Sequence, residues 1–167
     1  MSPSKPTQEP SWEVRSCTEA DCKWLAHRLT KGCTEELKDI SKYAPLSVLL
    51  KDFETKAVIV DRRRPAQPVA IIEAVKDVPG TQAGAIWIGL TEYIVSSEWF
   101  WSFTNYAFAA LTLMQADHPT LYTYVDKRNV RQALWLERVG FDLVETISQF
   151  GHKELPVKLY KRTKPNV

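Results

Sequence analysis

Several residue types are scarce in this 167-residue sequence, and each scarcity excludes a class of protein. The three cysteines, Cys17, Cys22 and Cys33, form neither an even set nor a C-x-x-C pair. This pattern argues against a disulfide framework and against a zinc site, so we expect no bound metal. The simplest expectation is three buried, unreactive thiols in a reducing compartment.

Long apolar runs and a strong charge imbalance are missing as well. No stretch approaches the roughly 20 uncharged residues that span a bilayer, and residues 1–10 lack the apolar segment of a signal peptide. The net charge is only +2, so composition does not point to nucleic acid as a partner. We therefore expect a protein made in the cytoplasm without membrane insertion.

Apolar residues are plentiful enough for one sizeable core. The sequence is 44% hydrophobic and 11% aromatic, which for this length favours a single domain. We place this domain at residues 11–163. Residues 1–10 carry three prolines among polar side chains and are predicted to form a flexible arm, and residues 164–167 a short tail.

The hydrophobic periodicity predicts alternating helices and strands. Strands are expected at 12–17, 57–60, 69–75, 85–91, 121–125, 142–148 and 157–161, and helices at 18–31, 35–43, 46–55, 98–114 and 129–139. The first helix is predicted to begin at a Thr18 cap supported by Asp21, to run to about Lys31 and to stop at Gly32. This order indicates a mixed α/β sheet with helices on its faces.

The clearest local signal is the strand, turn and helix of residues 121–141. Asn129 has the side chain of a helix cap, and Gln132 three residues later is expected to reach back to it as in a capping box. Gly140 can adopt the left-handed conformation that ends a helix, and Phe141 would then pack on Leu136. By pattern alone this is a well-capped structural helix.

Aromatic residues are concentrated around residues 98–114, where the predicted helix is apolar nearly all round. Such a helix must be mostly buried or must cover a partner. Three of these aromatics, together with one in the helix predicted at 129–139, exceed what one helix packed on one sheet needs, and surplus aromatic residues often anchor interfaces. The predicted interaction residues are Trp99, Phe100, Trp101 and Trp135.

Two segments carry a resemblance to a known family. VRSCTEADCKWLAHRL (residues 14–29) and NVRQALWLERVGF (residues 129–141) are similar to the first strand and helix and to the Asn-to-Gly-Phe motif of the GNAT (Gcn5-related N-acetyltransferase) family. More narrowly, IWIGLT (residues 86–91) and the segment 124–129 resemble a phage branch of that fold, the internal virion protein A type of short-tailed bacteriophages. The resemblance implies a GNAT-like central mixed sheet of about six or seven strands.

The resemblance also implies an acetyl-CoA site, and the sequence departs from it. The family holds the cofactor pyrophosphate in a glycine-containing loop with a basic residue, because backbone N–H groups must close on the phosphates. The corresponding residues 91–101, TEYIVSSEWFW, have no glycine and no basic residue, and Glu92 and Glu98 would repel phosphate. A tyrosine acid is often found where this chain has Leu136. We also expect the cleft beside the central strand to be narrowed by Trp87 or Trp135.

Weak candidates for the site remain. The catalytic candidates are Glu92 as a base and Tyr122 or Tyr124 as an acid, and the cofactor-binding candidates are Ser96, Ser97, Glu98 and Asn129. The bland interpretations are an exposed glutamate at a strand end and tyrosines that only pack. His27 has no partner at helical spacing and is read as a surface or packing residue.

Three interpretations follow. The preferred one is a non-catalytic, GNAT-like phage protein without a cofactor, in the host cytoplasm during infection and in the virion, which contacts phage structural proteins in virion assembly or the internal core. The alternative is an active acetyl-CoA-dependent N-acetyltransferase with an atypical loop. The third, nucleic-acid binding, rests on a set of basic residues and is the weakest. These residues are Arg62, Arg63, Arg64, Lys127, Arg128 and Arg131.

Overall fold

The computed structural model describes residues 8–73 and 76–164. Its strands are β1 (Trp12–Ser16), β2 (Ala57–Asp61), β3 (Ala70–Ile72), β4 (Lys76–Asp77), β5 (Ala83–Ala85), β6 (Ile88–Leu90), β7 (Thr120–Asp126), β8 (Asp142–Phe150) and β9 (Leu155–Thr163). Its helices are α1 (Glu19–Leu25), α2 (Lys31–Ser41), α3 (Pro45–Leu50), α4 (Glu92–Ser96), α5 (Phe100–Met114) and α6 (Val130–Arg138), with a 3₁₀ turn at Phe53–Thr55. Most of the predicted arm, most of the predicted tail and the end of the strand predicted at 69–75 lie outside the described residues.

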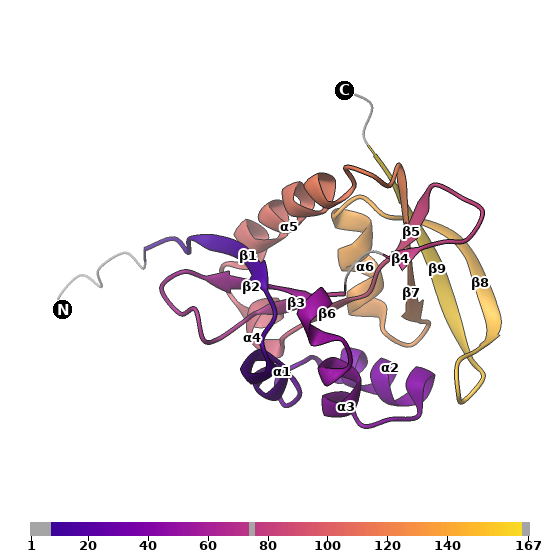
Figure 1. The fold of residues 1–167 in the computed structure, drawn as a ribbon, viewed down its shortest axis with the longest axis horizontal. Helices are drawn as coiled ribbons and strands as arrows, with labels where there is room; N and C mark the ends of the chain where they lie inside the picture. The colour runs from indigo at the N-terminus through magenta and orange to yellow at the C-terminus, as the bar shows by residue number, and fades with distance from the viewer. Residues whose placement is uncertain (1–7, 74–75, 165–167) are drawn as a thin grey trace.

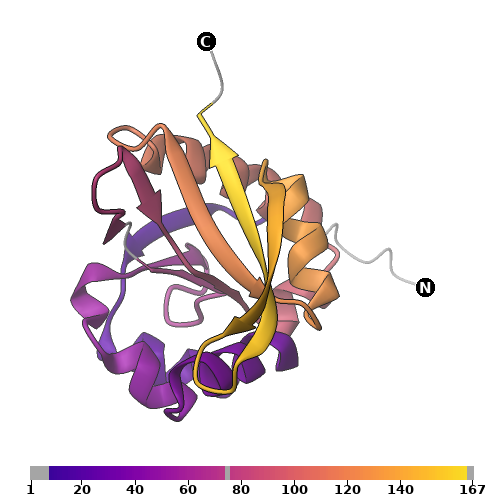
Figure 2. The ribbon, with the colours of Figure 1, turned by 90° about the vertical axis from the view of Figure 1, so that its right-hand side faces the viewer.

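The strands form two sheets that meet in the middle of the molecule. One has the order β1-β2-β3-β6 and is antiparallel throughout, and the other has the order β4-β5-β7-β9-β8, in which β5 and β7 run parallel (Figures 1 and 2). The chain passes from one sheet to the other between β5 and β6, at Ile86 and Trp87. The predicted mixed α/β class is confirmed, and the single central strand predicted at 85–91 is divided into two.

Alternating side chains on β2 show how the core is layered. Val58 and Val60 pack with residues of α1, α2 and α3, whereas Ile59 between them packs with residues of α5 and α6. Successive side chains of a strand point to opposite faces, so the four-stranded sheet is covered by helices on both sides (Figure 1). The near-continuous apolar character of β2 and β3 follows from this burial on both faces.

The first helix is capped as predicted but ends early. Thr18 and Asp21 form the expected capping box. α1 then stops at Leu25, because the backbone of the next residues pairs with the end of β6 and the start of α4: Thr30 N–H donates to Leu90 O at 2.9 Å. Thr30 caps a new helix, α2, and the predicted stop at Gly32 is wrong because this glycine lies in the first turn of α2.

The helix α6 begins and ends as predicted, with one exception. The Asn129 side chain accepts the Gln132 N–H, Gly140 has a φ of 97°, and Phe141 N–H donates to Leu136 O at 3.0 Å. The Gln132 side chain does not return to the cap, so this half of the predicted capping box is wrong. It donates instead to a strand on the other side of a cleft.

Two further observations concern membranes and thiols. None of the helices in the described part of the chain is long and apolar enough to cross a membrane. All three cysteines are free and buried, as predicted, although the sulfur atoms of Cys17 and Cys22 lie only 3.7 Å apart. Burial raises the pKa of Cys17 to about 12 and that of Cys33 to about 11, so both remain protonated, unreactive thiols.

Candidate functional site

A cleft opens where the two sheets separate. The parallel pairing of β5 with β7 ends when Ile86 N–H donates to Tyr122 O at 2.9 Å. Within the described residues, β6 then continues on β3 and the rest of β7 continues on β9. The facing edges of β6 and β7 therefore carry backbone groups that no neighbouring strand binds. Divergent strands of this kind offer a slot in which an extended ligand could be bound.

The chain fills this slot with its own groups. Ile88 O on β6 accepts the Gln132 Nε2–H at 2.8 Å, and Leu90 O accepts the backbone N–H of Thr30 at 2.9 Å. Across the cleft, Asp126 N–H on β7 donates to Glu36 Oε1 at 2.8 Å. The cleft is thus narrowed as expected: side chains of α2 and α6 close it, and the predicted Trp87 takes part through its bond to Glu36.

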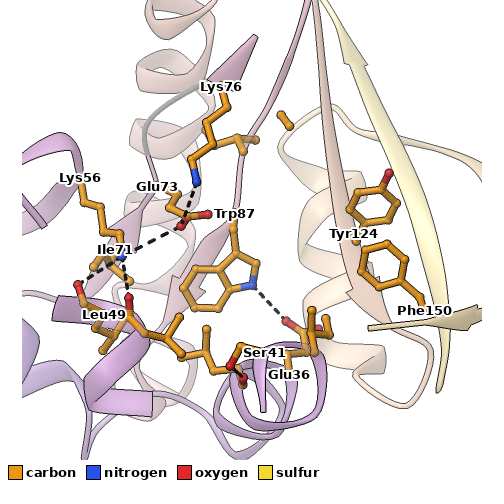
Figure 3. A pocket seen from close by; sticks show the side chains of 15 residues that line it. Glu36, Ser41, Leu49, Lys56, Ile71, Glu73, Lys76, Trp87, Tyr124 and Phe150 are labelled. Carbon is orange, nitrogen blue, oxygen red and sulfur yellow. Dashed lines mark hydrogen bonds and ion pairs between the residues drawn. The ribbon is translucent and has the colours of Figure 1, made fainter. Parts of the chain in front are cut away.

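Glu36 is the centre of this arrangement, and Figure 3 shows its contact with Trp87. Oε1 also accepts Nδ2–H of Asn129 at 3.2 Å, and Oε2 accepts the indole N–H of Trp87 at 3.3 Å. The residue is only 1% exposed. Burial raises the pKa of the Glu36 carboxyl to about 7, despite the opposing effect of its three hydrogen-bond donors.

The beginnings of α2 and α6 approach each other very closely at the same place. A Cβ atom on Gly32 would lie 2.5 Å from the side-chain oxygen of Asn129, so only glycine fits here. One residue further, Cys33 Sγ lies 3.8 Å from Gln132 Oε1. The cleft is therefore closed by a compact set of side chains from two helices.

Two cavities lie on opposite sides of this closure. The first, of about 260 Å³, has Glu36 in its wall and is otherwise largely apolar, with Trp87, Tyr124 and Phe150 among its lining residues (Figure 3). Tyr124 and Phe150 stack with their ring centroids 4.6 Å apart. Polar groups also lie along the wall, where Glu73 is close to Lys76, at 3.9 Å, and to the largely buried Lys56, at 4.0 Å.

The second cavity, of about 320 Å³, lies between the beginnings of α2 and α6 and the residues around the start of α5. Its basic side chains are all paired. Lys31 lies 3.8 Å from Glu35, and Arg131 lies 3.1 Å from Glu92. Arg128 contacts Asp126 at 2.6 Å and is held further by Asp39 on α2. The cavity consequently has little free positive charge for an anionic ligand.

The segment predicted to bind cofactor phosphates folds differently from the prediction. Residues 92–96 form the short helix α4, which the sequence did not predict, and α5 starts at Phe100 with Trp99 as its cap residue. Ser97 N–H donates to Ile94 O at 3.2 Å, and the N–H groups of Trp99 and Phe100 donate to the side chain and backbone oxygens of Ser97. These amides are used within the segment itself.

The other predicted site residues are dispersed. Glu92 is exposed in α4, as are the side chains of Ser96 and Glu98. Tyr122 is half-buried on β7, outside the lining of both cavities, whereas Tyr124 lines the first one. Of the predicted cofactor-binding residues, only Asn129 reaches the cleft, where it caps α6 and donates a hydrogen bond to Glu36.

The four predicted interaction residues separate into two groups. Trp101 is 57% exposed, with the Arg138 guanidinium 4.5 Å from its ring centroid, and Trp99 and Phe100 are partly exposed. Trp135 is only 3% exposed, stacks on Phe103 at 6.0 Å and donates its indole N–H to Thr104. Trp135 is thus a core residue and cannot belong to an interaction surface.

Sequence reasoning missed Glu36 and the second role of Gln132. A signal for Glu36 was present, because Cys33, Leu37 and Ile40 place the apolar stripe of α2 around it. A carboxylate on an apolar stripe is rarely buried without hydrogen-bond donors, so its position indicated a polar contact in the interior. No comparable signal indicated the bond from Gln132 to β6, because a role in the capping box already accounted for this residue.

Comparison with known proteins adds the fold. Neither a protein-family model nor a curated protein sequence matches this chain. Among solved structures, a GNAT-family acetyltransferase from Bacillus anthracis is similar with a TM-score of 0.66 and 11% identity, over 94% of this chain and 97% of the other. The chain has the GNAT fold.

Other solved GNAT structures are similar to this chain to the same degree. The ribosomal-protein-S5-alanine acetyltransferase from Vibrio fischeri superposes with a TM-score of 0.63 at 15% identity, covering 96% of this chain and 97% of that one. A mutant of the spermidine N-acetyltransferase from Vibrio cholerae gives a TM-score of 0.62 at 12% identity, covering 92% and 94%. At these identities the likeness establishes the GNAT fold and leaves the activity to be argued from the site.

Proposed function

We propose that this GNAT-fold protein no longer binds acetyl-CoA and acts through contacts with a protein partner. The observation that carries the proposal is the closure of the cleft between β6 and β7. A pantetheine arm needs that slot, yet Ile88 O is bound by Gln132 and the β7 edge is bound by Glu36. Entry of a ligand would break these buried hydrogen bonds, each of which is costly to leave unmade.

The pyrophosphate end of the site supports the same proposal. A helix N-terminus binds phosphate through backbone N–H groups that have no other acceptor. Around the start of α5, the amides of Ser97, Trp99 and Phe100 already have acceptors. Glu98 adds a negative charge beside them, and the basic residues of the nearby cavity are paired.

The proposed partner surface lies on α5 and α6. Trp101 and Phe108 are exposed by 57% and 40% and lie two turns apart on α5. Leu134, 53% exposed, precedes Arg138 by one turn on α6, and Arg138 covers part of the Trp101 ring. An exposed aromatic and apolar surface with a flanking arginine has the composition of a protein interface.

The phage resemblance suggests which partner to test. We propose a structural protein of the virion, which the chain would contact during assembly in the host cytoplasm or within the internal core. Support for this choice comes from the sequence segments 86–91 and 124–129 only, whereas the exposed surface argues for a partner irrespective of its source.

Two experiments test the proposed function. Titration calorimetry with acetyl-CoA should give no heat at millimolar cofactor, and saturable binding to the wild-type protein would contradict the loss of the cofactor site. Pull-down with purified virion structural proteins should weaken in Trp101→Ala and stay unchanged in Tyr43→Ala. Tyr43 is the matched control because it is 58% exposed but lies just after α2. Equal retention by both variants would remove this surface from the proposal.

A second candidate function, acetyl transfer to an amine, is favoured by one observation. Glu36 has a pKa raised to about 7 and lines a largely apolar cavity next to the cleft, so it is suited to accept a proton from a primary amine. Acetylation of spermidine or of a peptide N-terminus by the wild type, abolished in Glu36→Gln, would establish this function. Absence of turnover with both acceptors would leave the non-catalytic proposal.

A further inference from the structure

A third cavity, outside the cleft, has chemistry that neither function uses. It has a volume of about 390 Å³ and lies where the end of α1, the β2–β3 hairpin and the start of α4 meet. Glu92 N–H donates to Arg28 O at 3.0 Å, so the segment that follows α1 is held beside the start of α4. The side chains that define it are Trp12, Trp24, Arg28, Arg64 and Tyr93.

The cavity has a surplus of positive charge. Its two carboxylates are neutralised from outside its walls: Asp61 accepts three hydrogen bonds from the Arg63 side chain, and Glu92 pairs with Arg131 at 3.1 Å. The Arg63 bonds lower the pKa of Asp61, so the carboxylate stays ionised and engaged. Among the described residues, neither Arg28 nor Arg64 has a carboxylate within ion-pair distance.

The cavity also presents flat surfaces in fixed orientations. The Arg28 guanidinium lies 3.5 Å from the centroid of the Trp24 ring, and its NH1 group donates to the Trp24 carbonyl at 3.0 Å. This double contact holds the guanidinium over an aromatic ring, and a guanidinium group is itself a planar surface on which another planar group can stack. Trp12 is fixed at the other wall by its indole bond to Ser102, and Tyr93 is exposed at the opening.

We propose that this cavity binds a small planar aromatic anion, with its ring on the Arg28–Trp24 stack and its carboxylate or phosphate on Arg64. A cation is disfavoured by the two unpaired guanidinium groups, and an aliphatic anion would leave the aromatic walls unused. Aryl carboxylates and nucleoside monophosphates share this chemistry. The site is independent of the cleft and of the proposed partner surface, so it stands whichever function is correct.

The test uses matched probes and the full chain. The probes are AMP and 4-hydroxybenzoate, compared with adenosine, which lacks the anion, and ribose 5-phosphate, which lacks the ring. Binding is followed by calorimetry and by the indole resonances of selectively labelled tryptophans. We expect AMP or 4-hydroxybenzoate to bind and to shift the Trp24 resonance. Adenosine and ribose 5-phosphate should bind with at least about ten-fold lower affinity.

Neighbouring arginines supply the control. Arg64→Gln should weaken the bound probe about ten-fold, whereas Arg62→Gln should not, because Arg62 pairs with Glu13 on the surface and does not line the cavity. Both residues are exposed, so neither variant endangers folding. The proposal is overturned if neither aromatic anion binds at millimolar concentration, if the two variants bind equally, or if the Trp24 resonance is unmoved on binding.

Discussion

Two junctions between a strand and a helix flank the cleft, and they use their hydrogen-bonding groups differently. At the junction of β7 and α6, the Asn129 side chain caps α6 and also donates to Glu36 on α2. The Asp126 amide donates to Glu36 as well. At the junction of β6 and α5, Leu90 and Glu92 still bond to the α1–α2 connection, but the residues just before α5 bond among themselves, because Ser97 accepts the N–H groups of Trp99 and Phe100. The β7–α6 junction uses its hydrogen-bonding groups across the cleft, whereas the residues just before α5 use theirs locally.

This difference explains why the fold persists without its expected site. Long-range bonds at the β7–α6 junction stabilise the closed cleft, and local bonds just before α5 occupy the amides of Ser97, Trp99 and Phe100. Both arrangements meet an ordinary requirement of stability, because buried polar groups need hydrogen-bond partners whether or not a ligand is ever bound. The comparison can be tested by removing one group at a time.

Removal of Glu36 should have the largest effect. Glu36→Ala leaves the N–H groups of Asp126, Asn129 and Trp87 without their acceptor, and we expect a loss of roughly 3–5 kcal/mol in the free energy of unfolding. Urea denaturation at neutral pH measures it. Glu35→Ala is the control, because the side chain of this neighbour is 42% exposed and its removal should cost less than about 0.5 kcal/mol. Equal losses would mean that Glu36 does not hold the cleft.

The second effect is a pH dependence of stability. Because the pKa of Glu36 is about 7 in the folded protein and about 4.5 when unfolded, folding takes up a proton between these values. The free energy of unfolding should therefore fall as pH rises from 5 to 7, by on the order of 2–3 kcal/mol, and level off above this range. Glu36→Gln cannot titrate, so denaturation at a series of pH values should show this part of the slope only in the wild type. Parallel curves would contradict the raised pKa.

Gln132 tests the side of the cleft formed by β6. In Gln132→Ala the Ile88 carbonyl loses its donor, and we expect a loss of about 1–2 kcal/mol, read from thermal and urea unfolding. Arg131→Ala alters the preceding residue, whose ion pair with Glu92 is exposed, and should change stability by less than about 0.5 kcal/mol. If removing Gln132 costs no more than removing Arg131, its bond to β6 contributes nothing.

The smallest effect is expected at the local junction. Ser97→Ala removes the acceptor of the Trp99 amide and should cost about 0.5–1 kcal/mol, as for other capping hydroxyls. Ser96→Ala, at an exposed position, should be close to neutral. Calorimetric melting of the pair gives the difference. A cost for Ser97 comparable to that for Glu36 would erase the contrast between the two junctions.

Local signals in the sequence predicted the frame of the fold well. The Thr18 and Asn129 caps and the Gly140 stop occur where the side chains placed them, since each depends on residues a few positions apart. The mixed α/β order followed from the same short-range periodicity. The early end of α1 did not, because it depends on Thr30 pairing with Leu90, sixty positions along the chain.

The site was less predictable for the same reason. Gln132 satisfied a local rule, the capping box, while its actual acceptor lies on another strand. Trp101 and Trp135 look equally surplus in the sequence, but only the packing of α5 against α6 decides which one is exposed. The missing glycine in residues 91–101 was visible from the start, whereas the closure of the cleft by Glu36 required the contact between α2 and β7.

The closure of the cleft also bears on the order of folding. The Asn129 cap joins residues only 3 positions apart, whereas the bonds from α2 to Asp126, Asn129 and Gln132 span 90, 93 and 99 positions. Long loops close at a greater entropic cost, so these contacts form after the local helices and hairpins. A chain still emerging from the ribosome can complete β6 and α2 yet has no α6 to bind. Variants in the closure should therefore accelerate unfolding more than they retard folding.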